Sequence, residues 1–290
     1  MAKSAIQRSL ELLSHLSLRS LYRVGNLLAF VLRNTSNQVS RQARENIELC
    51  FADWDKAERR RLYRESLRHT CYTMTELAAV WCWPVERVLE RITAFDVCAE
   101  FERSQRRRII LAPHPGSWET LALWLGRHCD IIMMYKRRKN RADDRFVLEA
   151  RARSGGSLVP TKKRGLRQLL LGLKNGKDLM ILPDQRPGGK KAYIEAEFFG
   201  LDAPTTTLVH NLCSKMDCDV FIANMTRSMP PGEFSLRIKP LEHARLAADD
   251  SSSAQYMNDE IEALARQHLE QYQWGYRRFG KKAYASLEQG

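Results

Sequence analysis

From residue 107 to residue 119 the sequence reads Arg107-Arg108-Ile109-Ile110-Leu111-Ala112-Pro113-His114-Pro115-Gly116-Ser117-Trp118-Glu119. The apolar run at 109–112 has the length and composition of a buried strand, and Pro113 ends it. Pro115 and Gly116 favour a turn after the strand, and a helix is predicted to begin near Trp118. A strand, a turn and a helix in this order form the repeating unit of α/β sheets.

The same alternation continues toward the C-terminus. Further strands are predicted at 131–135, 179–182, 220–223 and 234–238. Helical patterns lie between them, near 118–127, 142–153, 164–175 and 205–216, and a final helix is predicted at about 253–272. We therefore predict an α/β fold in which a central, mostly parallel β-sheet is flanked by helices.

The residues before this core have a different pattern. Segment 34–105 is predicted to be helical, and together with an α/β core at 106–290 it would form one domain, 34–290. Segment 1–33 is apolar but carries charges on one helical face, and Arg19 and Arg23 interrupt the roughly 20 apolar residues that a membrane-spanning helix needs. We predict an amphipathic helix that lies on a membrane, and a helix docked on its own domain fits the pattern equally well.

Composition limits the partners. The 290 residues are 44% hydrophobic, which is typical of a globular chain, and 47 Lys and Arg against 34 Asp and Glu give a net charge of +13. This excess favours a polyanionic partner, which could be nucleic acid, an anionic membrane or an acidic protein; a general solubility charge is the alternative. The seven cysteines form no C-x-x-C pair, so the sequence predicts no metal site and a reducing compartment.

His114 is the first candidate for chemistry. It follows the 109–112 strand, at the strand end where open α/β sheets place ligands, and Ser117 is predicted to cap the next helix. Glu119 would lie in the first turn of that helix, so its carboxylate is predicted to reach the imidazole. Such a pair makes a general base that takes a proton from a hydroxyl of the acceptor. A histidine with a purely structural role is the alternative.

Three further blocks have a recognisable order. They are Arg151 to Gly156 (Arg-Ala-Arg-Ser-Gly-Gly); Pro183-Asp184-Gln185 with Phe198-Phe199-Gly200 and Thr205-Thr206-Thr207; and the tail from Gln271 to Phe279. With the His-x-x-x-x-Glu motif they span residues 109–279, and in that order the chain resembles the late acyltransferases of lipid A biosynthesis, the lauroyl and myristoyl transferases of Gram-negative bacteria.

The resemblance implies a glycerolipid-acyltransferase-like fold and a reaction without cofactor or metal. A fatty acyl chain would pass from acyl carrier protein to a hydroxyl of a phosphorylated lipid A precursor, at the cytoplasmic face of the inner membrane. His114 would be the base and Glu119 its partner, and Arg151 and Asp184 would contact substrate or hold the site. Arg186 departs from the pattern, because some members carry a second acidic residue there.

Basic residues between positions 136 and 164 follow the motif. They could attract the acidic carrier protein or the lipid phosphates, although a solvated run of charges is the alternative: Lys136, Arg137, Arg138, Lys139, Arg141, Arg145, Arg151, Arg153, Lys162, Lys163 and Arg164.

Other functions remain open at this point. The acceptor could be another lipid, such as a lysophospholipid or an amino-acid lipid. A non-catalytic basic protein that binds membranes or nucleic acid is the alternative outside enzymes, since the tail mixes aromatic and cationic residues. No nucleic-acid-binding motif accompanies the tail, so nucleic acid is not the expected partner. The sequence also lacks a P-loop, a G-x-S-x-G elbow and an H-E-x-x-H motif.

Overall fold

The computed structural model of the protein describes residues 3–161, 163–188 and 193–288. The longer helices are α1 (Ala5–Leu13), α2 (Leu18–Asn34), α3 (Gln38–Cys50), α4 (Lys56–Cys82), α7 (Trp118–His128), α8 (Arg141–Ala152), α9 (Lys163–Lys174) and α12 (Asp250–Arg266). The shorter ones are α5 (Val85–Leu89), α6 (Ala99–Arg103), α10 (Leu208–Cys213), α11 (His243–Ala248), η1 (Leu269–Gln271), α13 (Lys281–Ala285) and η2 (Ser286–Glu288).

The strands of the described residues form a central sheet and a separate hairpin. They are β1 (Ile92–Val97), β2 (Arg108–Leu111), β3 (Ile131–Tyr135), β4 (Ser157–Pro160), β5 (Asp178–Ile181), β6 (Tyr193–Phe198), β7 (Leu201–Thr206), β8 (Asp219–Arg227) and β9 (Phe234–Leu241). The central sheet has the order β1-β9-β8-β2-β5-β3-β4, and its pairs are parallel except β8 with β9. The predicted α/β fold is confirmed.

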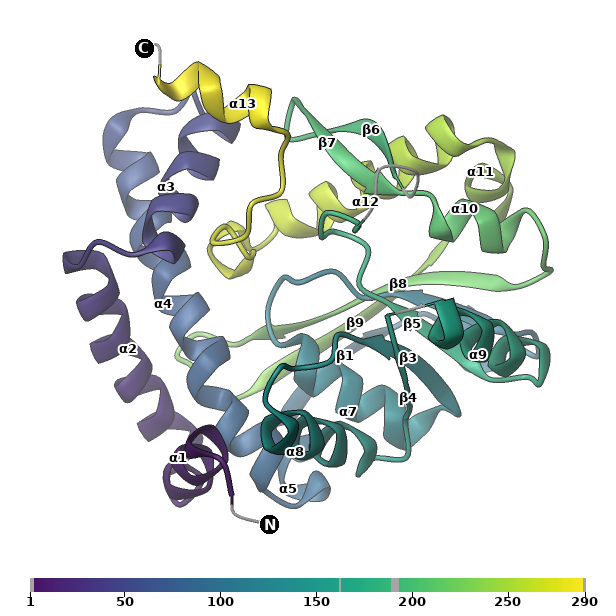
Figure 1. Ribbon diagram of the computed structural model, residues 1–290, viewed down its shortest axis with the longest axis horizontal. Helices are drawn as coiled ribbons and strands as arrows, with labels where there is room; N and C mark the ends of the chain where they lie inside the picture. The colour runs from purple at the N-terminus through teal and green to yellow at the C-terminus, as the bar shows by residue number, and fades with distance from the viewer. Residues whose placement is uncertain (1–2, 162, 189–192, 289–290) are drawn as a thin grey trace.

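Both faces of the central sheet are buried. Because successive strand residues point to opposite faces, Ile110, Met180 and Phe221 pack on one side with α7 and α8. Their neighbours Ile109 and Leu179 pack on the other side with α9, α10 and α12. Figure 1 shows α7 and α8 on one side of the sheet and α10 and α12 on the other. The sheet is therefore the middle layer of a three-layer α/β/α arrangement.

Several strands were not predicted from the sequence. β1 lies inside the segment expected to be helical, and it lacks a period of two because it is mostly exposed and pairs only with β9. β7 occupies the start of the helix expected at 205–216, so that α10 begins at Leu208. The hairpin of β6 and β7 turns at Phe199 and Gly200, whose φ values of 51° and 74° are left-handed. The apolar residues of this hairpin do not recur at helical spacing, and the turn at Phe199 and Gly200 was not recognised in the sequence.

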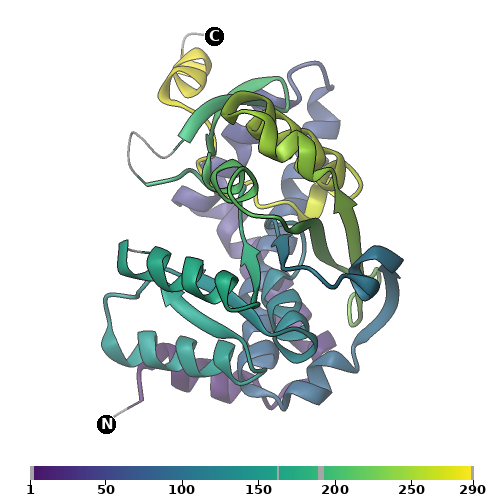
Figure 2. The same ribbon diagram turned by 90° about the vertical axis from the view of Figure 1, so that its right-hand side faces the viewer.

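The N-terminal segment forms two helices rather than one. α1 ends at Leu13, and Ser17 caps α2 by accepting a hydrogen bond from the backbone N–H of Ser20 at 3.2 Å. α2 buries Leu21 and Tyr22 against α4, as the docking alternative expected, and leaves its opposite face exposed. None of the described helices combines the length and the apolar content that crossing a bilayer requires. Seen from two directions, α1 and α13 lie at opposite ends of the molecule (Figure 1 and Figure 2).

Candidate active site

His114 and Asp184 meet because two adjacent parallel strands end in register. β2 and β5 are neighbouring strands in the middle of the central sheet, and Leu111 of β2 pairs with Ile181 of β5. His114 comes three residues after Leu111, and Asp184 comes three residues after Ile181. The chain segments past both strand ends therefore bring the imidazole and the carboxylate together at the carboxyl edge of the sheet.

Asp184 holds His114 through both of its carboxylate oxygens, one on the backbone and one on the imidazole. The His114 backbone N–H donates to Oδ2 at 2.9 Å, and Nδ1 lies 2.7 Å from Oδ1. Burial by itself raises the pKa of Asp184, but the charge of His114 and its ring and backbone hydrogen bonds outweigh that effect and lower the pKa. The ionised carboxylate accepts from Nδ1–H, so the lone pair is on Nε2. That nitrogen lies 3.0 Å from the Gln185 side-chain nitrogen, which also donates to Gln273 at 3.1 Å.

Glu119 has other partners than the ones expected. Among the described residues no hydrogen bond joins Glu119 to His114; the carboxylate instead accepts from Arg151 Nε at 3.0 Å, from a second guanidinium nitrogen of Arg151, and from Trp81 Nε1 at 3.1 Å. Burial raises the pKa of Glu119, but the charge and hydrogen bonds of Arg151 and the bond from Trp81 lower it overall. The direct partner of the imidazole is thus Asp184, a residue whose contact with His114 the sequence did not predict.

His114, Glu119 and Arg151 nevertheless line one cavity of 620 Å³. Apolar side chains such as Met133, Val147 and Leu182 form much of the lining. His114 itself is 5% exposed and packs edge to face on Trp118, with ring centroids 4.8 Å apart. The cavity therefore combines an apolar interior with a histidine, a carboxylate and cationic groups on its walls.

Some of the basic residues at 136–164 line the cavity, and others lie elsewhere in the protein. Lys136, Arg138 and Arg151 line the cavity. Arg153 instead donates to the backbone oxygens of Val80 and Trp83, where it satisfies carbonyl groups at the end of α4. Lys162 lies outside the described residues. Part of the run thus faces the candidate site and part has a structural role.

The turn between His114 and α7 lies tightly against β8. Gly116 has a φ of 77°, and a Cβ atom there would lie 2.0 Å from the Met225 carbonyl oxygen, so only glycine fits. Ser117 was expected to cap α7 with its side chain, but its Oγ bonds Thr120 Oγ1 at 2.8 Å while its N–H donates to Met225. The Ser117 side chain therefore makes no capping hydrogen bond, and the backbone at this position, with φ −106° and ψ 75°, bonds β8 instead.

The C-terminal tail closes the site from the side of the hairpin. Tyr272, Trp274 and Phe279 are buried, and Arg278 donates to Thr205 Oγ1 at 2.9 Å and to the Pro204 carbonyl. The aromatic rings of Tyr272, Trp274 and Phe279 therefore pack inside the protein, where they are not available to stack on bases. Gln273 from the same tail reaches Gln185, so the tail contributes to the surroundings of His114 Nε2.

Sequence comparison gives a consistent result over nearly the whole chain. Residues 5–281 match the family model described as bacterial lipid A biosynthesis acyltransferase. Over 240 residues the chain is 27% identical to the lipid A biosynthesis palmitoleoyltransferase of Escherichia coli strain K12, covering 82% of this chain and 77% of that protein. It is 23% identical over 262 residues to the lipid A biosynthesis lauroyltransferase of the same strain, covering 89% and 85% of the two chains. A lipid A biosynthesis acyltransferase of Haemophilus influenzae is 26% identical over 240 residues, with 82% and 76% covered.

Proposed function

This chain belongs to the bacterial lipid A biosynthesis acyltransferase family, and from that premise we propose that it transfers a fatty acyl chain from acyl carrier protein to a hydroxyl of a phosphorylated lipid A precursor. The observation that carries the proposal is His114 in the wall of the 620 Å³ cavity, hydrogen-bonded from behind to the buried carboxylate of Asp184. The pair supplies a base, and the apolar lining provides a place for an acyl chain.

In the proposed reaction His114 Nε2 takes the proton of the acceptor hydroxyl. The hydroxyl oxygen attacks the carbonyl carbon of the donor thioester, the carbon–sulfur bond breaks, and the leaving thiolate receives the proton from the imidazolium. Asp184 keeps the proton on Nδ1 and stabilises the imidazolium while it exists. Gln185 lies 3.0 Å from Nε2, where the hydroxyl has to bind, so its amide gives way to the acceptor.

We propose that Glu119 holds the guanidinium of Arg151 in position. Glu119 is 5% exposed and accepts from the guanidinium through both carboxylate oxygens, a geometry that fixes the plane of the arginine. Lys136 and Arg138 line the same cavity, so several cations face one space. Phosphate groups of the acceptor or of the carrier's prosthetic group are the anions that such an arrangement suits. Arg151 and Asp184 thus have separate roles, one toward substrate charge and one toward the base.

The direct test is a product analysis with purified enzyme. We expect acyl transfer when acyl carrier protein loaded with a fatty acid meets an acylated, phosphorylated glucosamine lipid, with the product gaining the mass of one acyl chain. Lysophospholipid and amino-acid-lipid acceptors are assayed in parallel. Product from one of those acceptors alone would contradict the lipid A assignment, and no product from any donor and acceptor would contradict an acyltransferase role.

We further propose that the protein associates peripherally with the cytoplasmic face of the inner membrane through α2. The outer face of this helix exposes Leu27, Phe30 and Val31, which are 65%, 58% and 46% accessible. Beside its C-terminal end lies a groove with cationic walls, lined by Arg33, Arg44, Lys56, Arg59, Arg60 and Arg64. Exposed apolar side chains next to cations suit a surface of acyl chains beneath anionic head groups.

Replacing Leu27 and Phe30 together by aspartate is expected to weaken binding to anionic vesicles by at least about 100-fold, because each inserted side chain contributes about 1.5–3 kcal/mol. Co-sedimentation with vesicles measures the partition coefficient. Phe95→Asp is the matched control, since Phe95 on β1 is also 58% exposed and lies outside α2. An unchanged partition coefficient for the double variant would rule out α2 as the membrane-binding element.

A further inference from the structure

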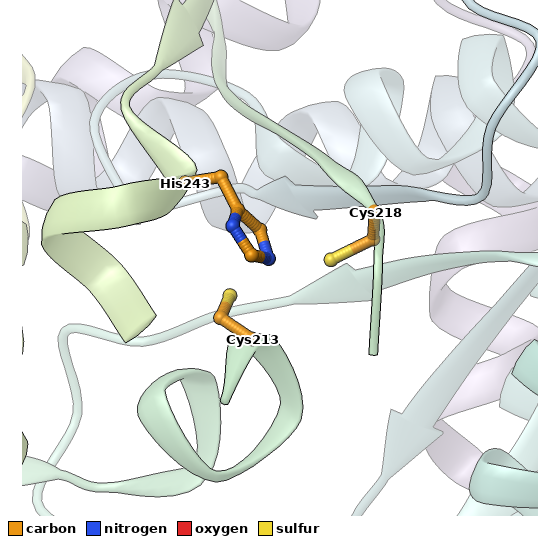
Figure 3. A group of neighbouring side chains, drawn as sticks. All are labelled: Cys213, Cys218 and His243. Carbon is orange, nitrogen blue, oxygen red and sulfur yellow. The ribbon is translucent and has the colours of Figure 1, made fainter. Parts of the chain in front are cut away.

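Cys213, Cys218 and His243 converge at a place away from the candidate active site. Cys213 ends α10, Cys218 precedes β8 directly, and His243 begins α11. Their ligand atoms, the two sulfurs and an imidazole nitrogen, all lie within 4.8 Å of one another. Figure 3 shows the three side chains directed toward a common point from these separate segments. Two cysteines five positions apart and a histidine 25 residues further on thus present two sulfurs and a nitrogen to one small volume.

The surroundings suit a bound ion. Cys213 and Cys218 are 3% and 1% exposed, so the sulfurs are withdrawn from solvent. His243 is oriented by the turn between the cysteines, because its Nε2 lies 3.2 Å from the Met216 carbonyl oxygen. In a tetrahedral zinc site, bond lengths of about 2.0–2.3 Å place ligand atoms roughly 3.5–3.8 Å apart. A contraction of the cluster by at most about 1.3 Å therefore gives the distances of a metal site.

The donor set selects the metal. Thiolates favour zinc, copper(I) and iron–sulfur clusters, and imidazole suits zinc, copper, iron and nickel, so zinc and copper are the metals that both kinds of ligand accept. Of these two metals, zinc is the one for which cysteine thiolates combined with histidine imidazole form the common structural donor set. The sequence alone did not suggest this site, because the cysteines are separated by four residues rather than two and the histidine follows 25 residues after Cys218.

We propose that Cys213, Cys218 and His243 bind a zinc ion, with a water molecule as the fourth ligand. On binding, the thiol protons of both cysteines leave to solvent and the imidazole nitrogen that faces the sulfurs donates its lone pair. None of these residues is among the described residues that line the 620 Å³ cavity, so the ion has no part in the acyl transfer. Its role is structural: it ties the ends of α10 and α11 to the start of β8.

Metal analysis of the purified protein tests the site. We expect about one zinc per chain in the wild type, and an affinity at least 100-fold lower in Cys218→Ser and His243→Ala. Cobalt(II) added to metal-free wild type is expected to give the thiolate-to-cobalt charge-transfer band and intense visible bands of a tetrahedral thiolate site. The cobalt measurement needs no variant, so it stands even where a substitution impairs folding.

Matched controls separate this site from other thiols and imidazoles. Cys129→Ser removes a buried free cysteine elsewhere, and His210→Ala removes a histidine of α10 that lies outside the cluster; both are expected to keep the metal. Zinc removal is expected to lower the Tm by more than about 5 °C while the specific activity well below the Tm is unchanged. Wild type that binds neither zinc nor cobalt, or a Cys213→Ser/Cys218→Ser variant that keeps its zinc, would overturn the proposal.

Discussion

His114→Ala is expected to lower kcat for acyl transfer by roughly 10²–10⁴-fold, because it removes the group that takes the proton from the acceptor hydroxyl. KM for both substrates should change much less, since the imidazole is a small part of the lining of the 620 Å³ cavity. Initial rates with acyl carrier protein donor and lipid acceptor, both near saturation, give the comparison. A variant that keeps more than about a tenth of the wild-type kcat would show that His114 is not the base.

Two isosteric variants distinguish the partners of the imidazole. Asp184→Asn presents an amide to Nδ1, which favours the tautomer with a proton on Nε2, so kcat should fall about as far as in His114→Ala. Glu119→Gln weakens the contact with Arg151 and leaves the pair of His114 and Asp184 in place, so it should mainly raise the KM of the anionic substrate. A loss of kcat at unchanged KM in Glu119→Gln would instead support the direct pairing of His114 with Glu119 that the sequence suggested.

Glu76→Ala is expected to lower the free energy of unfolding by about 3–5 kcal/mol, since it leaves a buried arginine without its counter-ion. The side chains of Arg227 and Glu76 are 0% and 1% exposed, and Arg227 Nε and a terminal nitrogen donate to the carboxylate at 2.8 and 2.6 Å. Tyr22 donates to the same carboxylate at 3.0 Å, which adds α2 to the network. Urea unfolding gives the difference in free energy.

A double variant distinguishes the cost of an unpaired buried charge from the cost of lost packing. Replacing both members, Glu76→Leu with Arg227→Met, removes the buried charges together and should recover most of the stability. Asp96→Ala is the matched surface control: it breaks the exposed pair of Arg237 with Asp96 at 2.7 Å and should cost less than about 1 kcal/mol. If Glu76→Ala were as mild as Asp96→Ala, the network would have no measurable part in the stability of the fold.

The apolar strands were predictable because they are buried on both faces. β2, β3 and β5 are short and almost entirely buried, so each reads as an apolar run between breaks. β1 pairs at the sheet edge and exposes most of its side chains, and β4 is only partly buried, so neither gives such a run. The break between α1 and α2 was missed because the apolar pattern continues on both sides of Ser17.

The sequence pointed to residues that line one cavity, His114, Glu119 and Arg151, but not to the partner of the imidazole. His114 and Glu119 are close in the chain, so a local argument joined them, whereas the imidazole's partner lies 70 residues away on another strand. Two strands that are adjacent and in register bring such residues together, and strand order is not visible in local periodicity. The convergence of Cys213, Cys218 and His243 has the same origin, because it depends on three segments that only the tertiary fold assembles.

His114 follows Leu111 by the same number of residues as Asp184 follows Ile181, and these two strand residues are paired. The site therefore depends on the length of the two connections more than on their composition. Inserting or deleting one residue in either connection would move its functional group by about 3.3 Å, which is more than the 2.7 Å bond between the ring and the carboxylate can absorb. Insertions in related chains should therefore be found elsewhere, while these two three-residue segments keep their length even where their side chains change.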